Sequence, residues 1–339
     1  MPEQTMASAQ MVMQQMSMSY ATAQAIYVAA QLGVADCLAD GAQGCDVLAQ
    51  LLDAHEPSLR RLMRLLASLG VFAEDDQGRF GLTALGACLR SEVPESVRSR
   101  VIMFGQPWMW QPFMQLFQTV KTGEPAFRLV HGAGLFDYLR EHPEANRIFH
   151  EGLRERTGEQ APRVAQAYDF TAMRTIVDIG GGTGVLLAAI LKAYPTLHGV
   201  LYDLPHVIDS ARPVLEAAGV AHRCATVSGD FFVSVPEGDA YVLSRILHDW
   251  GEAPSRTILE NCRKAIRPDG KLLIVEAIIK PPNVPDFGKL SDLYMLVLTD
   301  NGFEREADEF RALLGSAGFA LVKIWPVDAA ISVIEAVPV

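Results

Sequence analysis

The run VDIGGGTG at residues 177–184 is the segment of this 339-residue chain best suited to binding a ligand. An apolar strand pattern leads directly into a glycine-rich turn, and a helical pattern follows. Glycine adopts the unusual backbone angles of such a turn and has no Cβ to keep a ligand from the backbone. A nicotinamide dinucleotide fold would require G-x-G-x-x-G, but counted from Gly180 the third glycine position is Val185. The run therefore predicts a nucleotide-type cofactor, with a purely structural turn as the alternative.

Two acidic residues follow the next two strand patterns along the chain. Asp203 comes about 20 residues after the glycine run, the spacing of a carboxylate that accepts hydrogen bonds from ribose hydroxyls. Asp230 could accept a hydrogen bond from an adenine amino group while Phe231 packs against the ring. An Asp at a strand end can also cap a helix. The glycine run, Asp203 and Asp230 each follow a strand, and all three strand ends are expected at the carboxyl edge of one sheet. This favours a ligand site, because that edge is where open α/β folds bind ligands.

His248 is the candidate general base. The fourth strand pattern leads into it, and the fifth ends just before Glu276, so we expect both residues at the same edge as the cofactor acids. An unperturbed imidazole pKa near 6.5 suits proton transfer at neutral pH. Carboxylates from Glu276 or Glu304 could orient the imidazole and stabilise its charged form. A purely structural histidine is the alternative.

Strand and helix patterns alternate through the second half of the chain, which predicts a largely parallel sheet with helices on both faces. The last two strand patterns have only a few residues between them, which indicates an antiparallel final pair. The strands are expected at residues 175–179, 199–202, 225–228, 240–244, 271–275, 319–324 and 331–336.

The N-terminal part predicts helices followed by a hairpin, as in a winged-helix module. Leucines at helical spacing predict a helix over residues 57–69, and short strands at 71–73 and 79–82 flank a turn. DNA binding would use the arginines of the helix, whereas packing or dimerisation would not. We favour packing or dimerisation because the whole chain is acidic. The arginines are Arg60, Arg61 and Arg64.

Two further apolar features precede the sheet. Residues 95–165 are predicted to be helical and rich in aromatic side chains, a pattern more typical of core than of a binding site, although these helices could do both. The methionines near the N-terminus suit an adaptable contact surface or ordinary burial. They are Met6, Met11, Met13, Met16 and Met18.

Composition excludes several classes of protein. With 29 basic and 40 acidic residues the net charge is −11, which argues against binding to nucleic acid or to anionic membrane surfaces. No apolar run approaches the ~18 residues that span a bilayer, and residues 1–10 lack the pattern of a secretory signal. The five cysteines have no paired or zinc-site spacing, so we expect reduced thiols, no metal and a cytoplasmic protein.

Taken together, these residues resemble the class I S-adenosylmethionine-dependent O-methyltransferases, in the branch of plant caffeate-type and bacterial natural-product tailoring enzymes. The motifs DxGGGTG, DLP, GDF and HDW occur in that family's order, and the likeness covers nearly the whole chain. It implies an α/β fold: a Rossmann-like methyltransferase sheet, mostly parallel with an antiparallel last strand, and an N-terminal, mainly helical, winged-helix-like dimerisation domain. Residues 1–100 would form that domain, 101–165 a helical linker with acceptor-pocket helices, and 166–339 the cofactor-binding domain.

The resemblance also implies roles for individual residues. His248 would be the catalytic base, flanked by Glu276 and Glu304. S-adenosylmethionine would be held by Asp178, Gly180, Gly182, Asp203, Leu204, Asp230, Phe231, Ser244 and Arg245. The acceptor would be lined by Trp108, Phe113, Phe149, Leu153, Asp249, Met295 and Thr299. The small polar Thr299 and nearby arginines do not match a phenylpropanoid-type pocket, so caffeate is not predicted as the acceptor.

We therefore expect a cytoplasmic homodimer, joined through its N-terminal domain, that methylates an aromatic hydroxyl of a small metabolite without a metal, a nucleic acid or a membrane. Some members of the family have changed reaction, so N- or C-methylation and a non-methylating relative remain alternatives. A winged-helix regulator that binds a nucleotide is a further alternative. The sequence does not identify the acceptor.

Overall fold

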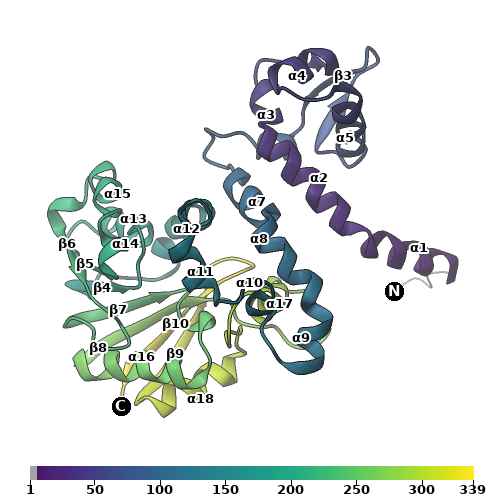
Figure 1. Cartoon of the computed structure of the whole chain (residues 1–339). Coiled ribbons are helices and arrows are strands. Elements are labelled where there is room, and N and C mark those ends of the chain that lie inside the picture. Colours follow the sequence, from purple (N-terminus) through teal and green to yellow (C-terminus); the bar gives the residue numbers. More distant parts are fainter. Residues whose placement is uncertain (1–5) are drawn as a thin grey trace. The chain divides into compact units, whose positions relative to one another are not determined.

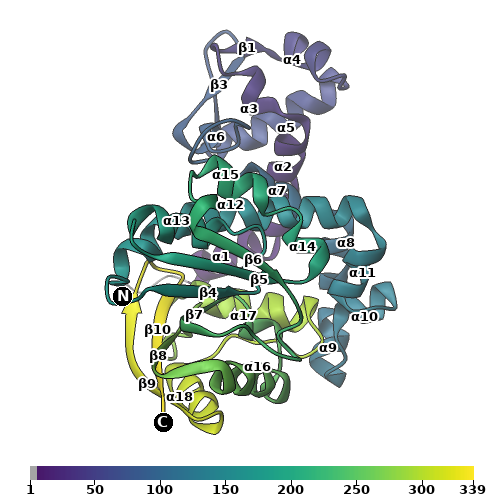
Figure 2. The same ribbon diagram turned by 90° about the vertical axis from the view of Figure 1, so that its left-hand side faces the viewer.

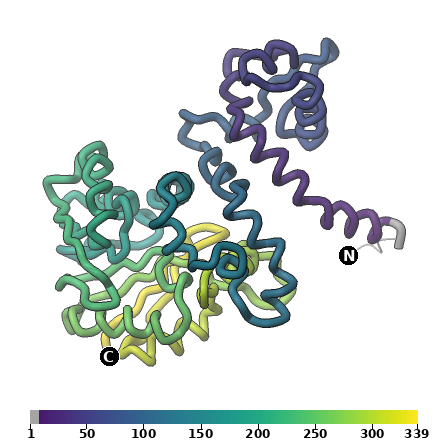
Figure 3. Tube along the Cα trace, viewed as in Figure 1, coloured from purple at the N-terminus to yellow at the C-terminus, as the bar shows by residue number. Residues whose placement is uncertain are grey.

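The computed structural model describes residues 6–339, with side chains described from Ser8 onward. The chain divides into two compact units. The first comprises the chain up to Trp110 together with Pro143–Arg156, and the second comprises Gln111–His142 and Thr157–Val339. The colours along the tube in Figure 3 follow the chain through both units. Residues 101–165, expected as one linker, are thus shared between the units, and helix α12 (Pro143–Ala167) belongs partly to each.

The first unit is mainly helical. The helix expected at residues 57–69 is α5 (Glu56–Ser68), and the expected hairpin is β2 (Phe72–Glu74) with β3 (Arg79–Leu82). A short strand that the sequence did not predict, β1 (Gln43–Gly44), pairs with the other side of β3. The helices of this unit are α1 (Met6–Ser17), α2 (Ser19–Leu32), α3 (Val34–Cys37), α4 (Cys45–Leu51), α5, α6 (Ala84–Ala87), α7 (Arg98–Gly105) and α8 (Pro107–Trp110).

The core of the first unit forms where α2, α4 and α5 meet the hairpin. Leu59, Met63 and Leu66 of α5 are buried there at helical spacing. Helix α1 differs, because Met13 and Met16 are 67% and 65% exposed. Ordinary burial within the unit is therefore excluded for these two methionines, while the side chain of Met6 lies outside the described residues.

The second unit is built on a seven-stranded sheet with the order β6-β5-β4-β7-β8-β10-β9 (Figure 1). The five strands from β6 to β8 are parallel, and β10 is antiparallel to both of its neighbours, which confirms the expected antiparallel final pair. The strands are β4 (Thr175–Ile179), β5 (His198–Asp203), β6 (Cys224–Ser228), β7 (Gly238–Ser244), β8 (Ile266–Glu276), β9 (Phe319–Pro326) and β10 (Ser332–Pro338).

Helices cover both faces of this sheet, as Figures 1 and 2 show. Successive strand residues point to opposite faces. Ile176 of β4 therefore packs in the core with α13 (Val185–Ala193) and α15 (Arg212–Ala217), and Val177 packs in the core with α16 (Glu252–Ala265) and α18 (Ala307–Ser316). The remaining elements of this unit are η1 (Gln111–Gln115), α9 (Leu116–Thr122), α10 (Ala126–His131), α11 (Leu135–Glu141), α14 (Pro205–Ile208), η2 (Ala221–Arg223), η3 (Leu247–Asp249) and α17 (Phe287–Leu298).

The parallel strands bring the candidate residues to one edge of the sheet. Asp203, Ser244 and Glu276 are the last residues of β5, β7 and β8, and the glycine turn follows β4.

Within residues 6–339, none of the helices combines the length and the apolar character that crossing a bilayer requires.

Candidate active site

The glycine turn has the backbone that its sequence predicts. Gly180, Gly182 and Gly184 all have positive φ angles, of 67°, 58° and 79°, which L side chains rarely adopt. The Gly180 amide donates a hydrogen bond to the Tyr202 carbonyl at 2.8 Å and so ties the turn to β5. A Cβ placed on Gly182 would meet no atom within 4 Å. The backbone at Gly182 therefore faces open space, in which a ligand can approach it.

Asp203 lies directly beside this turn. Its Oδ2 accepts a hydrogen bond from the Gly182 amide at 2.8 Å, and its Oδ1 accepts one from the Leu204 amide at 2.7 Å. Asp178 is buried on the neighbouring strand, and burial together with the charge of Asp203 raises its pKa to about 7. The carboxylate of Asp203 thus places acceptor oxygens at the glycine turn, where they suit the cationic or hydroxyl groups of a ligand.

The segment that follows β6 adds an aromatic ring to the site. A Cβ on Gly180 would lie 3.4 Å from the Phe231 ring, so that ring borders the turn. Asp230 is fixed by the Phe232 amide, which donates to its Oδ1 at 2.8 Å. A cavity of about 380 Å³ is lined in part by Tyr202, Gly229 and Asp230. An open glycine turn, a carboxylate and an aromatic ring form a set that fits the methionine, ribose and adenine parts of S-adenosylmethionine.

Arg245 follows the end of β7 in a left-handed conformation with φ of 55°, an uncommon angle for a residue with a Cβ. Its Nη2 donates to Oε1 of Gln160 on α12 at 2.7 Å. Its Nη1 is shielded from solvent and has no hydrogen-bond partner among the described residues. Burial lowers the pKa of this guanidinium against the opposing effect of the nearby acids Glu304 and Glu276. Such strain and an unpaired donor at a strand end are typical of functional sites.

His248 lies on the short 3₁₀ turn η3 and is 7% exposed. Its Nδ1 is 2.9 Å from Oε1 of Glu304, and its Nε2 is 3.6 Å from Oδ1 of Asp249. Burial opposes protonation of the imidazole, but the charge of Asp249 and the hydrogen bond and charge of Glu304 outweigh it and raise the pKa to about 9. One carboxylate therefore orients the ring, and the second lies near the nitrogen that remains for proton transfer.

The sequence suggested that Glu276 could orient the imidazole, but its hydrogen bonds go to backbone amides instead. Its Oε1 accepts hydrogen bonds from the amides of Ile246, Leu247 and His248, at 3.1, 2.7 and 3.3 Å. Burial raises the pKa of this carboxyl to about 7. Glu276 therefore binds the backbone at the start of η3, and Glu304 alone of these two contacts the ring. The sequence placed both acids at the correct edge but did not show which atoms each would face.

Three partners of the site residues, Ser291, Asp292 and Gln160, were missed by the sequence reasoning. Ser291 of α17 donates to Oε1 of Glu304 at 2.6 Å, and the Glu304 amide donates to Asp292 at 2.9 Å. The hydrogen bond and charge of His248 outweigh burial and hold the pKa of Glu304 below its usual range. Ser291 lies four residues before the predicted acceptor residue Met295, so helical spacing could have indicated it. Nothing in the sequence singled out Gln160.

The predicted acceptor residues are divided between the two units. Trp108, Phe149 and Leu153 belong to the first unit, where the rings of Trp108 and Phe149 are 6.5 Å apart. Phe113 belongs to the second unit and packs edge-on against Tyr294 of α17, with centroids 4.8 Å apart.

The remaining three predicted acceptor residues, Asp249, Met295 and Thr299, also belong to the second unit. The hydroxyl of Thr299 donates to the Met295 carbonyl and accepts from the Gly302 amide, each at 2.8 Å. Both bonds lie at the end of α17. The polar group of Thr299 thus stabilises that helix end, and no hydroxyl proton is left for a ligand.

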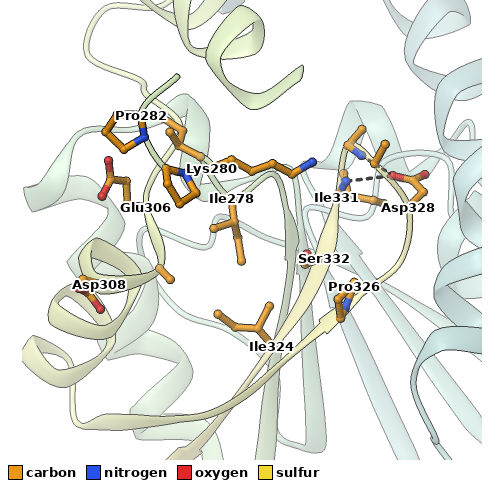
Figure 4. Close-up of a pocket in the computed structure, with 15 residues that line it drawn as sticks. Ile278, Lys280, Pro282, Glu306, Asp308, Ile324, Pro326, Asp328, Ile331 and Ser332 are labelled. Carbon is orange, nitrogen blue, oxygen red and sulfur yellow. Dashed lines mark hydrogen bonds between the residues drawn. The ribbon is translucent and has the colours of Figure 1, made fainter. Parts of the chain in front are cut away.

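A second cavity, of about 600 Å³, lies beside the last strands (Figure 4). Ile278, Lys280 and Ile324 are among its lining residues, and none of the predicted site residues is. Its wall includes Ile278 and Glu306, which lie two residues after Glu276 and Glu304 in the sequence. Among the described residues, no three His, Cys, Asp or Glu side chains converge in a way that could hold a metal ion.

Comparisons with known proteins agree with this geometry. An O-methyltransferase domain matches residues 113–320, and an O-methyltransferase dimerisation domain matches residues 13–92. The second match covers most of the segment that the sequence predicted as a winged-helix-like packing module. The first match contains the glycine turn, Asp203, Asp230 and His248 with its partner Glu304.

Individual relatives extend over nearly the whole chain. The phenazine O-methyltransferase PhzM of Lysobacter antibioticus is 45% identical over 329 residues, which cover 97% of this chain and 96% of that protein. The 8-amino-8-demethylriboflavin N,N-dimethyltransferase of Streptomyces davaonensis is 36% identical over 315 residues, which cover 91% and 90%.

One similar solved structure contains the cofactor. The O-methyltransferase NcsB1 from neocarzinostatin biosynthesis, in complex with S-adenosylmethionine and 2-hydroxy-5-methyl naphthoic acid, superposes with a TM-score of 0.81 at 32% identity and covers 94% of this chain and 96% of that one. This chain accordingly belongs to the O-methyltransferase family, and it is an S-adenosylmethionine-dependent methyltransferase.

Proposed function

We propose that this enzyme transfers a methyl group to an aromatic hydroxyl of a small metabolite, with His248 as the general base. The observation that carries the proposal is the buried contact between His248 Nδ1 and Glu304 Oε1 at 2.9 Å. A carboxylate on one imidazole nitrogen fixes the ring and stabilises the imidazolium that forms when the other nitrogen takes a proton. A phenol with a pKa near 10 is a poor nucleophile until it loses its proton, so it benefits from such a base.

The cofactor would be held by the residues around the glycine turn. When bound, S-adenosylmethionine supplies a methyl group on a sulfonium, which an oxygen nucleophile can accept. Asp203 would accept hydrogen bonds from the ribose hydroxyls, and Asp230 with Phe231 would bind the adenine. Asp178, Gly180, Gly182, Leu204, Ser244 and Arg245 would complete the cofactor site.

The charge state of His248 decides when it can act. With a pKa of about 9, the imidazole of the enzyme without acceptor is protonated at neutral pH. It becomes a base only after losing that proton, and its affinity for a proton is then close to that of a phenolate. We therefore expect methylation of an ordinary phenol to become faster as the pH rises towards 9. Asp249, 3.6 Å from Nε2, would share the acceptor side of the ring with the substrate hydroxyl.

The acceptor would contact Phe113, Met295 and the methyl group of Thr299, which belong to the same unit as His248. The enzyme would act as a homodimer joined through its dimerisation domain, with the exposed methionines of α1 at the contact. Its five cysteines are free thiols, which suits the reducing cytoplasm that we propose as its location.

Nitrogen methylation is the second candidate, because two relatives are named as an N,N-dimethyltransferase and an N-methyltransferase. A ring or amino nitrogen with a free lone pair needs no base before it attacks a methyl group. The buried pair of His248 and Glu304 would then be needed only to accept the proton that a methylated amine releases afterwards, whereas a phenol needs the base during the attack, and this difference supports an oxygen nucleophile.

The test is a screen of the full chain with S-adenosylmethionine carrying a ¹³C-labelled methyl group. The acceptors are hydroxyphenazines, 2-hydroxy-5-methyl naphthoic acid and matched analogues in which an amino group replaces the hydroxyl. We expect label on oxygen in the hydroxyl compounds, together with S-adenosylhomocysteine, and little turnover of the amino analogues. Label on nitrogen or carbon, or turnover of the amino analogues alone, would contradict the proposal.

A further inference from the structure

Arg305 has a completely buried side chain that the proposed chemistry does not use. Its Nη1 donates to the Leu247 carbonyl at 3.0 Å, and its Nη2 donates to the Trp250 carbonyl at 3.1 Å. The guanidinium also lies over the Phe303 ring, 4.1 Å from its centroid. A planar guanidinium holds several acceptors at once in a fixed geometry, which a lysine ammonium does not.

The two carbonyls bracket the candidate base. The turn η3 runs from Leu247 to Asp249, so Arg305 binds the backbone just before His248 and just after Asp249. Glu276 accepts the amides at the beginning of the same turn. A carboxyl oxygen therefore binds the N–H groups of the turn, and a guanidinium binds the C=O groups on either side of His248 and Asp249.

A hydroxyl supports the same two carbonyls. Ser255 Oγ lies 3.3 Å from the Leu247 carbonyl and 3.2 Å from the Trp250 carbonyl, to which it donates, and it accepts from Arg305 Nη2 at 3.3 Å. Ser255 is fully buried near the start of α16. The carbonyls flanking His248 are thus satisfied by side chains from two separate elements, and this leaves the turn little freedom to move.

Arg305 is also adjacent in sequence to Glu304, which contacts the imidazole. The segment is anchored to the chain after β8, because the Ile279 amide donates to the Arg305 carbonyl at 3.0 Å and Ile278 forms a parallel bridge with Arg305. Two consecutive residues on one anchored segment therefore hold the ring of His248 and the backbone carbonyls of Leu247 and Trp250. A shift of that segment would move both contacts together.

Stability alone does not explain this arginine. A buried ion is expensive to desolvate, and an apolar residue of similar volume often gives an equally stable fold. The acid with which it forms an ion pair, Glu252, is 3.3 Å from Nε but is itself 57% exposed. The position of the hydrogen bonds, on the carbonyls that flank the base, accounts for the residue better.

We infer that Arg305, together with Glu276, is a positioning residue that clamps the η3 turn and so fixes His248 Nε2 for proton transfer. The inference rests on the proposed role of His248 as the base. A misplacement of about 1 Å in a reacting group can cost about 100-fold in rate. Weakening the clamp should therefore lower kcat without lowering the affinity for S-adenosylmethionine.

The test uses the full-length Arg305→Lys variant, which keeps the charge but loses the planar set of donors. We expect kcat with the fastest hydroxyphenazine or hydroxynaphthoate acceptor to fall about 10- to 100-fold, while KM and the Kd for S-adenosylmethionine change less than about 2-fold. Hydrogen–deuterium exchange of the peptide covering residues 246–250 should become faster, and this readout needs no acceptor.

Arg223→Lys is the matched control. Arg223 also donates to backbone carbonyls, those of Leu197 at 2.6 Å, Leu191 at 2.8 Å and Tyr194 at 3.4 Å, but it precedes β6 at the edge of the sheet opposite the site. It should change neither kcat nor exchange at 246–250. Ser255→Ala is the milder second variant should Arg305→Lys fail to fold, and it should lower kcat a few-fold with unchanged cofactor affinity.

A double-variant cycle separates this inference from the proposed function. If Arg305 acts through His248, then Arg305→Lys should add less than about 2-fold to the loss already caused by His248→Gln. A fully additive loss, or a variant that behaves like Arg223→Lys, would overturn the clamp. Near wild-type kcat in His248→Gln itself would instead overturn the base, whatever Arg305→Lys does to exchange at 246–250.

Discussion

Replacing Glu304 with glutamine should change the proton affinity of His248 in a predictable direction. The substitution keeps the shape of a side chain that is 2.9 Å from Nδ1 and removes its charge. A hydrogen bond to a charged group contributes about 1.5–3 kcal/mol, and a neutral one about 0.5–1.5 kcal/mol. The difference, about 1–1.5 kcal/mol, corresponds to roughly a tenfold loss of proton affinity. The pKa of His248 should therefore fall from about 9 to roughly 8.

The assay is an NMR titration of the ¹³C-labelled histidine rings in the full chain, with the His248 resonance assigned by its loss in His248→Gln. The pH profile of kcat/KM should follow, because a base with a lower pKa becomes neutral at lower pH, so the rising limb moves towards acid. The variant should therefore lose more activity at pH 10 than at pH 7. A His248 pKa that stays near 9 in Glu304→Gln would refute the assigned cause of the shift.

Four further outcomes follow from the geometry. Asp203→Ala should weaken S-adenosylmethionine binding by about 1.5–3 kcal/mol, and unchanged affinity in calorimetry would remove Asp203 from the site. Deletion of residues 1–18 should weaken the dimer in light scattering and raise the acceptor KM more than the cofactor KM, since Met13 and Met16 are exposed; a fully dimeric truncation would argue against this. Gly105→Ala should lower the free energy of unfolding by about 1–3 kcal/mol, because its Cβ would overlap the Tyr27 ring. Gly158→Ala, in open space on α12, should instead raise it by about 0.5–1 kcal/mol, so equal effects on Tm would contradict the packing argument.

The sheet was predictable because buried parallel strands leave a strong sequence signal. Short apolar runs bounded by turns located all seven strands, and β4 appears with the predicted bounds, Thr175–Ile179. The position of β10 between β8 and β9 was not predictable in the same way, since strand order depends on which edges meet after the chain has turned. The two-residue strand β1 was missed because it carries too few residues for a periodic pattern.

The site was predictable at the level of the sheet edge and not at the level of single atoms. Parallel strands must bring Asp203 and Glu276 to one edge, whatever their side chains then contact. The backbone of η3 passes above the end of β8, and this path directs Glu276 to amide groups instead of the imidazole. Arg305 has no signal of its own in one sequence, because a single arginine beside a glutamate is typical of an exposed surface.

The central claim, an aromatic oxygen activated by His248, is tested most directly by comparing wild type and His248→Ala on acceptors of different acidity. For a phenol with a pKa near 10, the account predicts a loss in kcat of about 10²–10⁴ with an unchanged Kd for S-adenosylmethionine. For a phenol already ionised at the assay pH, the loss should shrink to less than about 10-fold, because no proton remains to be removed. An equal loss for both acceptors, or a small loss for the weakly acidic phenol, would contradict the account.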